Sequence, residues 1–238
     1  MGWIKTKVGL RTRLIRRRSG YKDNVKQIDN VKQHANVLLC KKTANLQRYW
    51  RSVTSDGLLP DMRYLVLDSL HLGTTTHLVE KCGVKLRDID ICSDGIEFDR
   101  QGYTGKLSTF LAKSSKTYDV VYFDFCGLLT TEENMLSVER LFSRGMLETA
   151  SVFAITFATR SSKKIGYFHE NTFGAFIKVQ QIAMKYGYHF GDTETVHNKK
   201  VSTYLSRCIH VKDALKKNGG INLDEQGRSP DRWVLGEF

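Results

Sequence analysis

The sequence predicts an α/β fold: a mostly parallel sheet with helices on both faces and a C-terminal antiparallel hairpin, preceded by a basic helical N-terminal extension. Short, almost wholly apolar runs, typical of strands covered on both faces, alternate with segments of helical periodicity. This alternation indicates a parallel sheet. The last two strand-like runs are separated only by the polar spacer from Asn198 to Lys200, which indicates a hairpin.

The positive charge lies mainly at the N-terminus. The chain of 238 residues has 37 Lys and Arg against 25 Asp and Glu, and residues 1–60 alone hold 14 of the basic and three of the acidic residues. Such a segment attracts polyanions, with affinity gained from counterion release. The alternative is a solvated tail or a localisation signal. The candidate nucleic-acid contacts are Arg11, Arg13, Arg16, Arg17 and Arg18.

Several classes of protein are excluded by composition and spacing. No apolar run approaches the ~20 residues that span a bilayer, and no apolar region of a secretory signal follows the basic start. We therefore expect an intracellular protein, nuclear or cytoplasmic in preference to mitochondrial. The five cysteines are odd in number and contain no C-x-x-C pair, so we expect small buried thiols and neither a disulfide framework nor a metal site.

The turn-like cluster at 55–60 divides the extension, residues 1–60, from a body at 61–215 and a tail at 216–238. An imperfect apolar stripe predicts a helix over 20–55. The expected strands of the body are 63–68, 88–92, 106–108, 118–124, 151–157, 188–197 and 201–210.

Helix signals separate these strands. Residues 74–82 read as a helix closed by Gly83, and 109–113 as a helical turn. Thr130 and Glu133 have the spacing of a capping box, which predicts a helix that ends at Gly145. Asn171 is the expected N-cap of a last helix, which Gly187 stops.

Ligands of such sheets bind outside the carboxyl ends of the strands, so the residues that follow each strand are the candidates. The first strand is followed by Asp68, Ser69 and a loop that reaches Gly73, and the second by Asp94. The strongest strand ends in Asp124-Phe-Cys-Gly127, and Arg160 follows the next one.

This arrangement resembles the class I S-adenosylmethionine-dependent methyltransferases, a Rossmann-like family, over roughly 61–210. The resemblance implies S-adenosylmethionine as cofactor. Asp68, Ser69 and Gly73 would hold its methionine end, Asp94 (or Asp90) its ribose, and Ser108 or Leu107 its adenine. It also implies that the residues beside the transferred methyl group are Asp124, Phe125, Cys126 and Gly127.

The chain departs from the family pattern at the cofactor loop. The family has Asp/Glu-x-Gly-x-Gly there, whereas Leu70 and Leu72 stand at the two glycine positions of this chain. Two functions therefore remain open: a methyltransferase acting on nucleic acid, RNA in preference to DNA, or a catalytically inactive nucleic-acid-associated module. A nucleotide-dependent oxidoreductase is disfavoured, because no Gly-x-Gly-x-x-Gly follows a strand.

Overall fold

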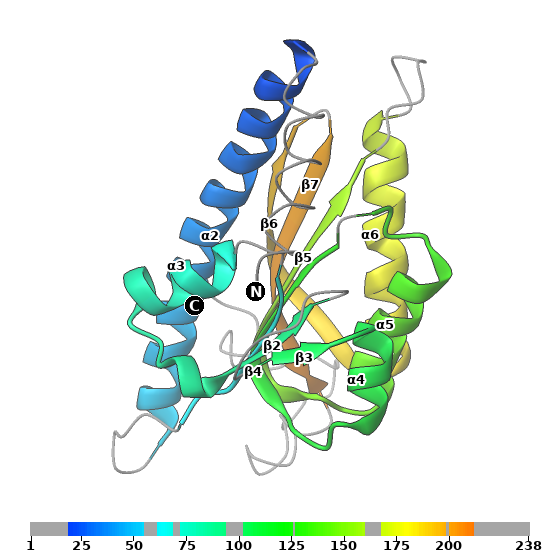
Figure 1. The fold of residues 1–238 in the computed structure, drawn as a ribbon. Helices are drawn as coiled ribbons and strands as arrows, with labels where there is room; N and C mark the ends of the chain where they lie inside the picture. Colours follow the sequence, from blue (N-terminus) through cyan, green and yellow to red (C-terminus); the bar gives the residue numbers. More distant parts are fainter. Residues whose placement is uncertain are drawn as a thin grey trace.

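The computed structural model describes residues 19–54, 61–68, 72–93, 102–125, 127–159, 168–198 and 200–211, with side chains from Ile28 onward and, in the last helix, from Thr172. These residues form a seven-stranded sheet in the order β3-β2-β1-β4-β5-β7-β6 (Figure 1). The strands are β1 Tyr64–Leu67, β2 Ile89–Ser93, β3 Gly102–Thr104, β4 Tyr118–Asp124, β5 Leu147–Ala158, β6 Tyr188–His197 and β7 Val201–His210.

The sheet is parallel except for one strand. Strands β1 to β5 pair in parallel, and β7 is inserted antiparallel between β5 and β6. The predicted fold class, with its C-terminal antiparallel hairpin, is therefore confirmed. The chain order reverses between β1 and β4, so the carboxyl ends of these two strands border the crevice in which such sheets bind ligands.

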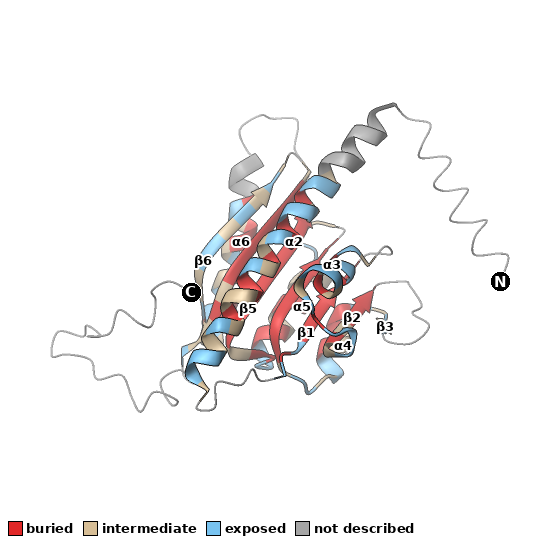
Figure 2. Cartoon of the chain, turned by 90° about the vertical axis from the view of Figure 1, so that its left-hand side faces the viewer, coloured by how far each residue is buried: buried red, intermediate tan, exposed pale blue. Residues whose placement is uncertain are grey.

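Helices cover both faces of the sheet. Helices α2 (Ser19–Val53) and α3 (Gly73–Cys82) lie on one face, with the short helix η1 (Leu86–Asp88) before β2. Helices α4, α5 and α6 lie on the other, and their apolar faces complete a second core (Figure 2). Their bounds are Leu107–Lys113, Glu132–Ser143 and Phe168–Lys185.

Alternation along β4 supplies both cores. Val120 and Tyr122 pack toward α2 and α3, whereas Val121 and Phe123 pack toward α4, α5 and α6. All seven residues of this strand are buried, which explains its continuous apolar run in the sequence. The next residue on the α2 side after Tyr122 is Asp124, so the strand directs a carboxylate toward that helix.

Helix α2 confirms the helix expected over 20–55 and packs tightly on the sheet. Ala35, Leu39 and Leu46 are buried, and Leu39 and Leu46 belong to the core between α2, α3 and the strands. The buried Lys42 pairs with Glu194 of β6 at 3.1 Å. Among the described residues, no helix is long and apolar enough to cross a membrane.

Three local predictions are wrong. The strand expected at 106–108 is Gly102–Thr104 instead, and Leu107 begins helix α4. Asn171 lies inside α6, which begins at Phe168. The N-cap of α5 is Thr131 rather than Thr130, because its side chain accepts the Asn134 N–H bond at 3.4 Å.

The cysteine prediction is wrong for two of the four described cysteines. Cys40 of α2 and Cys82 of α3 form a disulfide, with their Cα atoms 5.7 Å apart. The sequence separation of 42 residues gave no sign of this proximity, which the packing of α2 on α3 creates. Cys92 and Cys208 are the small buried thiols that we expected.

Candidate functional site

Two buried carboxylates lie side by side at the carboxyl ends of β1 and β4. The last paired residues of these strands are Leu67 and Phe123, and Asp68 and Asp124 follow them directly. Each carboxylate residue is only 5% exposed. Because alternate residues of a strand share a face, both follow the α2-facing positions Val66 and Tyr122 and point to the same side of the sheet.

Asp68 is bound to the start of α3. Its Oδ2 accepts the backbone N–H of Thr75 at 2.8 Å, so the carboxylate satisfies one of the free amides of the first helical turn. The positive end of the helix dipole also favours a negative charge here. This bond confirms that Asp68 joins the strand end to the helix, and it places the early amides of α3 at the same edge.

The residue before α3 has a backbone conformation that favours glycine. Leu72 has φ 48° and ψ 37°, in the left-handed region, and it occupies one of the two positions where the family pattern has glycine. Leu72 therefore has the left-handed backbone conformation that glycine usually adopts, although it is not glycine. Its half-buried side chain packs against the core beside α3.

We expect Leu72→Gly to unfold at higher urea than Leu72→Ala. Both substitutions lose the same buried leucine contacts, but only glycine removes the left-handed strain, about 1 kcal/mol. Urea titration of both variants measures the difference. An alanine variant as stable as the glycine variant would contradict the strained backbone.

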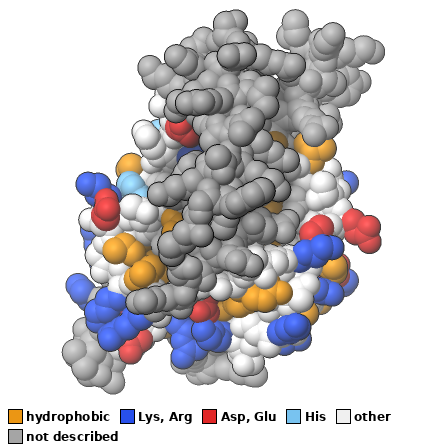
Figure 3. Space-filling view, in the orientation of Figure 1, with side chains coloured by type: hydrophobic (Ala, Val, Ile, Leu, Met, Phe, Trp, Pro, Cys, Tyr) orange, Lys and Arg blue, Asp and Glu red, His pale blue; other side chains and the backbone are white. Residues whose placement is uncertain are grey.

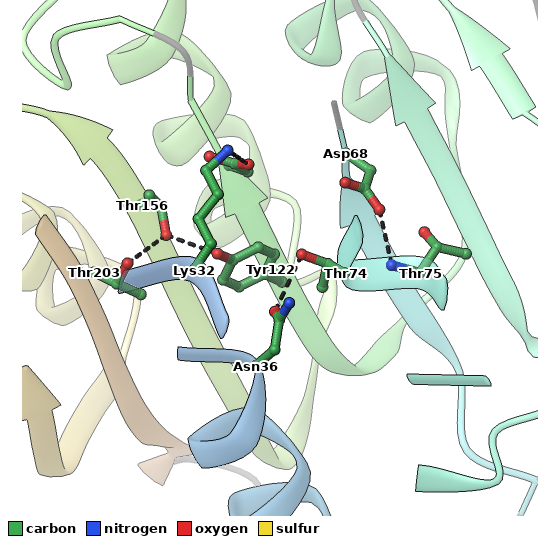
Figure 4. A network of polar contacts seen from close by, with 9 residues as sticks. Lys32, Asn36, Asp68, Thr74, Thr75, Tyr122, Thr156 and Thr203 are labelled. Atoms are coloured by element: carbon green, nitrogen blue, oxygen red, sulfur yellow. Dashed lines mark hydrogen bonds and ion pairs between the residues drawn. The ribbon is translucent and has the colours of Figure 1, made fainter. Parts of the chain in front are cut away.

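Asp124 forms an ion pair with Lys32 of α2 (Figure 4). The carboxylate is almost wholly buried, whereas the Lys32 side chain is 27% exposed. Burial raises the pKa of Asp124, the Lys32 ammonium lowers it, and the neighbouring Asp68 raises it. A carboxyl group with a raised pKa and a cationic partner is suited to accept or share a proton with a bound group.

A chain of hydroxyl groups crosses the sheet beneath this pair. The Tyr122 and Thr156 hydroxyls are 2.8 Å apart, and those of Thr156 and Thr203 are 2.7 Å apart. Thr74 donates to the side-chain oxygen of Asn36 at 3.2 Å, which links α3 to α2 (Figure 4). These contacts satisfy buried polar groups and hold the strands and both helices in one arrangement around Asp124.

A pocket of about 410 Å³ opens beside Asp124. It lies between α2 and the ends of β4, β5 and β7, on the side of Asp124 away from Asp68. Its wall combines apolar side chains with two ammonium groups and one carboxylate. The lining residues are Ile28, Lys32, Asp124, Phe125, Thr156, Ala158, Thr159, Lys200 and Val201.

The backbone after Asp124 is already engaged. The Phe125 N–H donates to the Thr156 carbonyl at 2.8 Å, and the Gly127 carbonyl accepts the Ala158 N–H at 2.9 Å. The amide of Phe125 is therefore not available to orient a ligand. The Phe125 ring is buried against Phe123 and forms one wall of the pocket.

Two further predicted cofactor residues lie in α4 and β2. Ser108 lies in α4, where its hydroxyl donates to Glu133, and its neighbour Leu107 is a core residue. Asp90, the alternative to Asp94, binds Lys116 and the Tyr118 hydroxyl at 2.8 Å near the opposite end of the sheet. Asp90 therefore does not join Asp68 and Asp124, whereas Ser108, which follows β3 at the start of α4, stays a prediction.

The remaining candidates fall outside the described residues. They are Ser69, Asp94, Cys126, Arg160 and the arginines Arg11, Arg13, Arg16, Arg17 and Arg18. Tyr49 and Trp50 are half-buried against the core at the far end of α2. Tyr49 lies beside Ala150 and Ile209, away from Asp124.

Lys32 is the residue beside Asp124 that sequence reasoning missed. A signal was present, because Lys32 directly follows Val31 in the apolar stripe of α2 and stands four residues after Ile28, which lines the same pocket. A lysine beside a buried stripe needs an acidic partner. The sequence does not identify that acid, because its identity depends on how α2 crosses the sheet.

Comparisons with known proteins give only low similarity. No protein-family model and no curated protein matches the sequence. Among solved structures, magnesium protoporphyrin IX methyltransferase from Synechocystis PCC 6803 matches with 12% identity, 81% and 87% coverage of the two chains and a TM-score of 0.45. NodS, an N-methyltransferase from Bradyrhizobium japonicum, matches with 8% identity, 74% and 87% coverage and a TM-score of 0.43.

The fibrillarin pre-rRNA processing protein of Methanococcus jannaschii matches with 14% identity, 63% and 68% coverage and a TM-score of 0.39. The chain spans about half the length of two other matched structures, 43% and 55%. The strand order and the single antiparallel strand, rather than these scores, decide the fold. The chain has a class I methyltransferase-like fold.

Proposed function

We propose that this protein binds S-adenosylmethionine at the carboxyl ends of β1, β2 and β4 and transfers its methyl group to a nucleic acid, RNA in preference to DNA. One observation carries the proposal. Asp68 and Asp124 are buried side by side where the strand order reverses, and a pocket of about 410 Å³ adjoins Asp124. Buried carboxylates need partners, and within the protein Asp68 accepts the Thr75 N–H bond while Asp124 pairs with Lys32.

The residues around Asp68 fit the methionine end of such a cofactor in part. A Cβ added at Gly73 or at Gly127 would meet nothing within 4 Å, so the backbone is open to a ligand at both ends of the crevice. Asp68 supplies a carboxylate for an ammonium group, and the first turn of α3 supplies amides. Ser69 and Asp94 stay predictions for the same cofactor.

The bound cofactor would supply a methyl group on a sulfonium that is already activated, so the protein mainly has to align the acceptor. Asp124 would accept a hydrogen bond from the acceptor N–H or O–H and take its proton. Lys32 would hold Asp124 in place, and the Phe125 ring would form a flat wall for a base.

The proposal of a nucleic-acid partner rests on the positive charge of the N-terminal segment. The basic excess lies in residues 1–60, and the arginines before Ser19 have few acids near them in sequence. On the face in Figure 3, described Lys and Arg side chains lie in separate groups with Asp and Glu among them. The N-terminal segment is therefore the proposed polyanion contact, and with it we propose an intracellular location.

A catalytically inactive module is the second candidate. The Lys32 pairing that neutralises Asp124 and the leucine at position 72 favour it. Such a protein would bind nucleic acid, in a salt-dependent way, without transferring a methyl group.

Calorimetry with S-adenosylhomocysteine tests the cofactor proposal. We expect micromolar-range binding by the full chain and a loss of about tenfold or more in Asp68→Ala, because the ammonium partner is removed. Asp90→Ala is the matched control, since Asp90 lies near the opposite end of the sheet and should leave affinity unchanged. No heat with the wild-type protein would remove the proposal.

Transfer of a labelled methyl group to RNA then separates the two candidates. Binding with transfer, and loss of transfer in Asp124→Asn, supports the enzyme. Binding of RNA without transfer supports the inactive module instead.

A further inference from the structure

One face of α2 contacts both Asp124 and helix α3, the helix that follows the loop after Asp68. Lys32 pairs with Asp124, Asn36 accepts the hydrogen bond from Thr74 at the start of α3, and Cys40 forms the disulfide with Cys82 at the end of α3. These three residues of α2 are spaced four apart and so lie on one side of the helix. Both ends of α3 are therefore attached to the same face of α2.

Helix α3 is short and buries little apolar surface. It is only 10 residues long, which is below the length at which a helix is stable by itself. Its buried residues are Thr74, Thr75 and Leu78, so one large apolar side chain is fully buried. Its outward residues and its C-cap Gly83 are exposed. The position of α3 thus depends on the packing of Leu78 and Val79 and on its links to Asp68, Asn36 and Cys40.

We propose that the Cys40–Cys82 disulfide is a reversible redox latch that fixes α3, and with it the loop leading from Asp68, against the N-terminal helix. When the bond is reduced, α3 keeps its two polar links but loses its covalent one. The first turn of α3 then opens more often, and the amides beside Asp68 are held less firmly.

The chemistry of the described cysteines agrees with this assignment. Cys40 and Cys82 are both half-buried, so a small thiol reagent can reach them. Cys92 and Cys208 are buried in the sheet, where burial raises the pKa of each thiol and keeps it unreactive. The 5.7 Å between the Cα atoms of Cys40 and Cys82 is within the range for a disulfide.

Glutathione disulfide is a sufficient oxidant. One protein thiolate attacks it, forms a mixed disulfide and releases one glutathione thiolate. The second protein thiolate attacks the protein sulfur of that mixed disulfide, forms the Cys40–Cys82 bond and releases the second glutathione. The two protein thiols lose two protons and two electrons, and the oxidant is reduced to two glutathione molecules. Glutathione runs the same steps in reverse.

Hydrogen exchange of the full chain tests the latch without a ligand. We compare protein oxidised with glutathione disulfide and protein reduced with a phosphine. We expect the amides of residues 73–82 to exchange roughly tenfold faster in the reduced protein, with those of β4 unchanged. Cys40→Ala should show the fast exchange in both conditions, whereas the control Cys208→Ala should respond as the wild type does.

Two outcomes would overturn the latch. One is equal exchange of α3 in oxidised and reduced protein. The other is alkylation of both Cys40 and Cys82 after treatment with glutathione disulfide, which would show that no bond forms.

The effect on ligand affinity rests on the proposed function. If S-adenosylhomocysteine binds, the oxidised form should bind it about tenfold more tightly, because its loop is already ordered. Equal affinity would contradict the coupling of the latch to the site. Absence of binding to either form would contradict the proposed function, and the exchange data alone would then decide the latch.

Discussion

Replacing Lys32 by Met destabilises the folded protein by about 3 kcal/mol at pH 8 and by much less near pH 4, since it leaves a buried carboxylate without its partner. Met keeps the length and the helix propensity of the side chain, so the effect reports the charge. Urea unfolding at a series of pH values measures it. Lys41→Met, on the exposed side of the same helix, is the matched control and should be nearly neutral.

The direction of this pH dependence follows from the pKa of Asp124. A carboxyl whose pKa is raised on folding takes up a proton, so its contribution favours folding below the ordinary value of 3.8 and is lost as the pH rises through the folded pKa. Without Lys32 the folded pKa rises further, and the loss extends to higher pH. Adding Asp124→Asn removes the charge and should restore most of the stability at pH 8. A double variant as unstable as Lys32→Met would contradict the pairing.

Loss of the Cys40–Cys82 disulfide is expected to have the largest effect on stability. A bond between residues 42 apart restricts the unfolded chain, which corresponds to about 4 kcal/mol in the chain-entropy account. For a chain of this size the melting temperature should fall by roughly 10 °C on reduction. Calorimetric scans with and without a reductant measure the shift.

The variant Cys40→Ala provides the control for this shift. It should melt at the lower temperature and show no further change with reductant. If the wild type melts at the same temperature in both conditions, the disulfide contributes nothing to stability.

The fold was largely predictable from the sequence, because the buried strands are continuous runs of mostly apolar residues. The strand from Tyr118 to Asp124 and the hairpin of β6 and β7 agree with their expected bounds. β3 was missed because its three residues are exposed or half-buried at the sheet edge and have no apolar pattern. Asn171 failed as a cap because the same residue type is tolerated inside a helix.

Only those site residues that directly follow a buried strand were predictable from the sequence. Asp68 and Asp124 follow apolar runs, and parallel pairing brings such ends together. Lys32 and the Cys40–Cys82 bond depend on how a helix far away in sequence crosses the sheet, which no local pattern specifies. The element that carries Ser108 was assigned as a strand, whereas Ser108 lies in the first turn of α4, after β3.

Helix α2 is unbroken from Ser19 to Val53, so the distance between any two of its residues is fixed. The helix begins at Ser19, and Lys32 stands 13 residues later, which is about 20 Å at 1.5 Å per residue. One unbroken helix therefore holds Ser19 about 20 Å along its axis from the residue that pairs with Asp124.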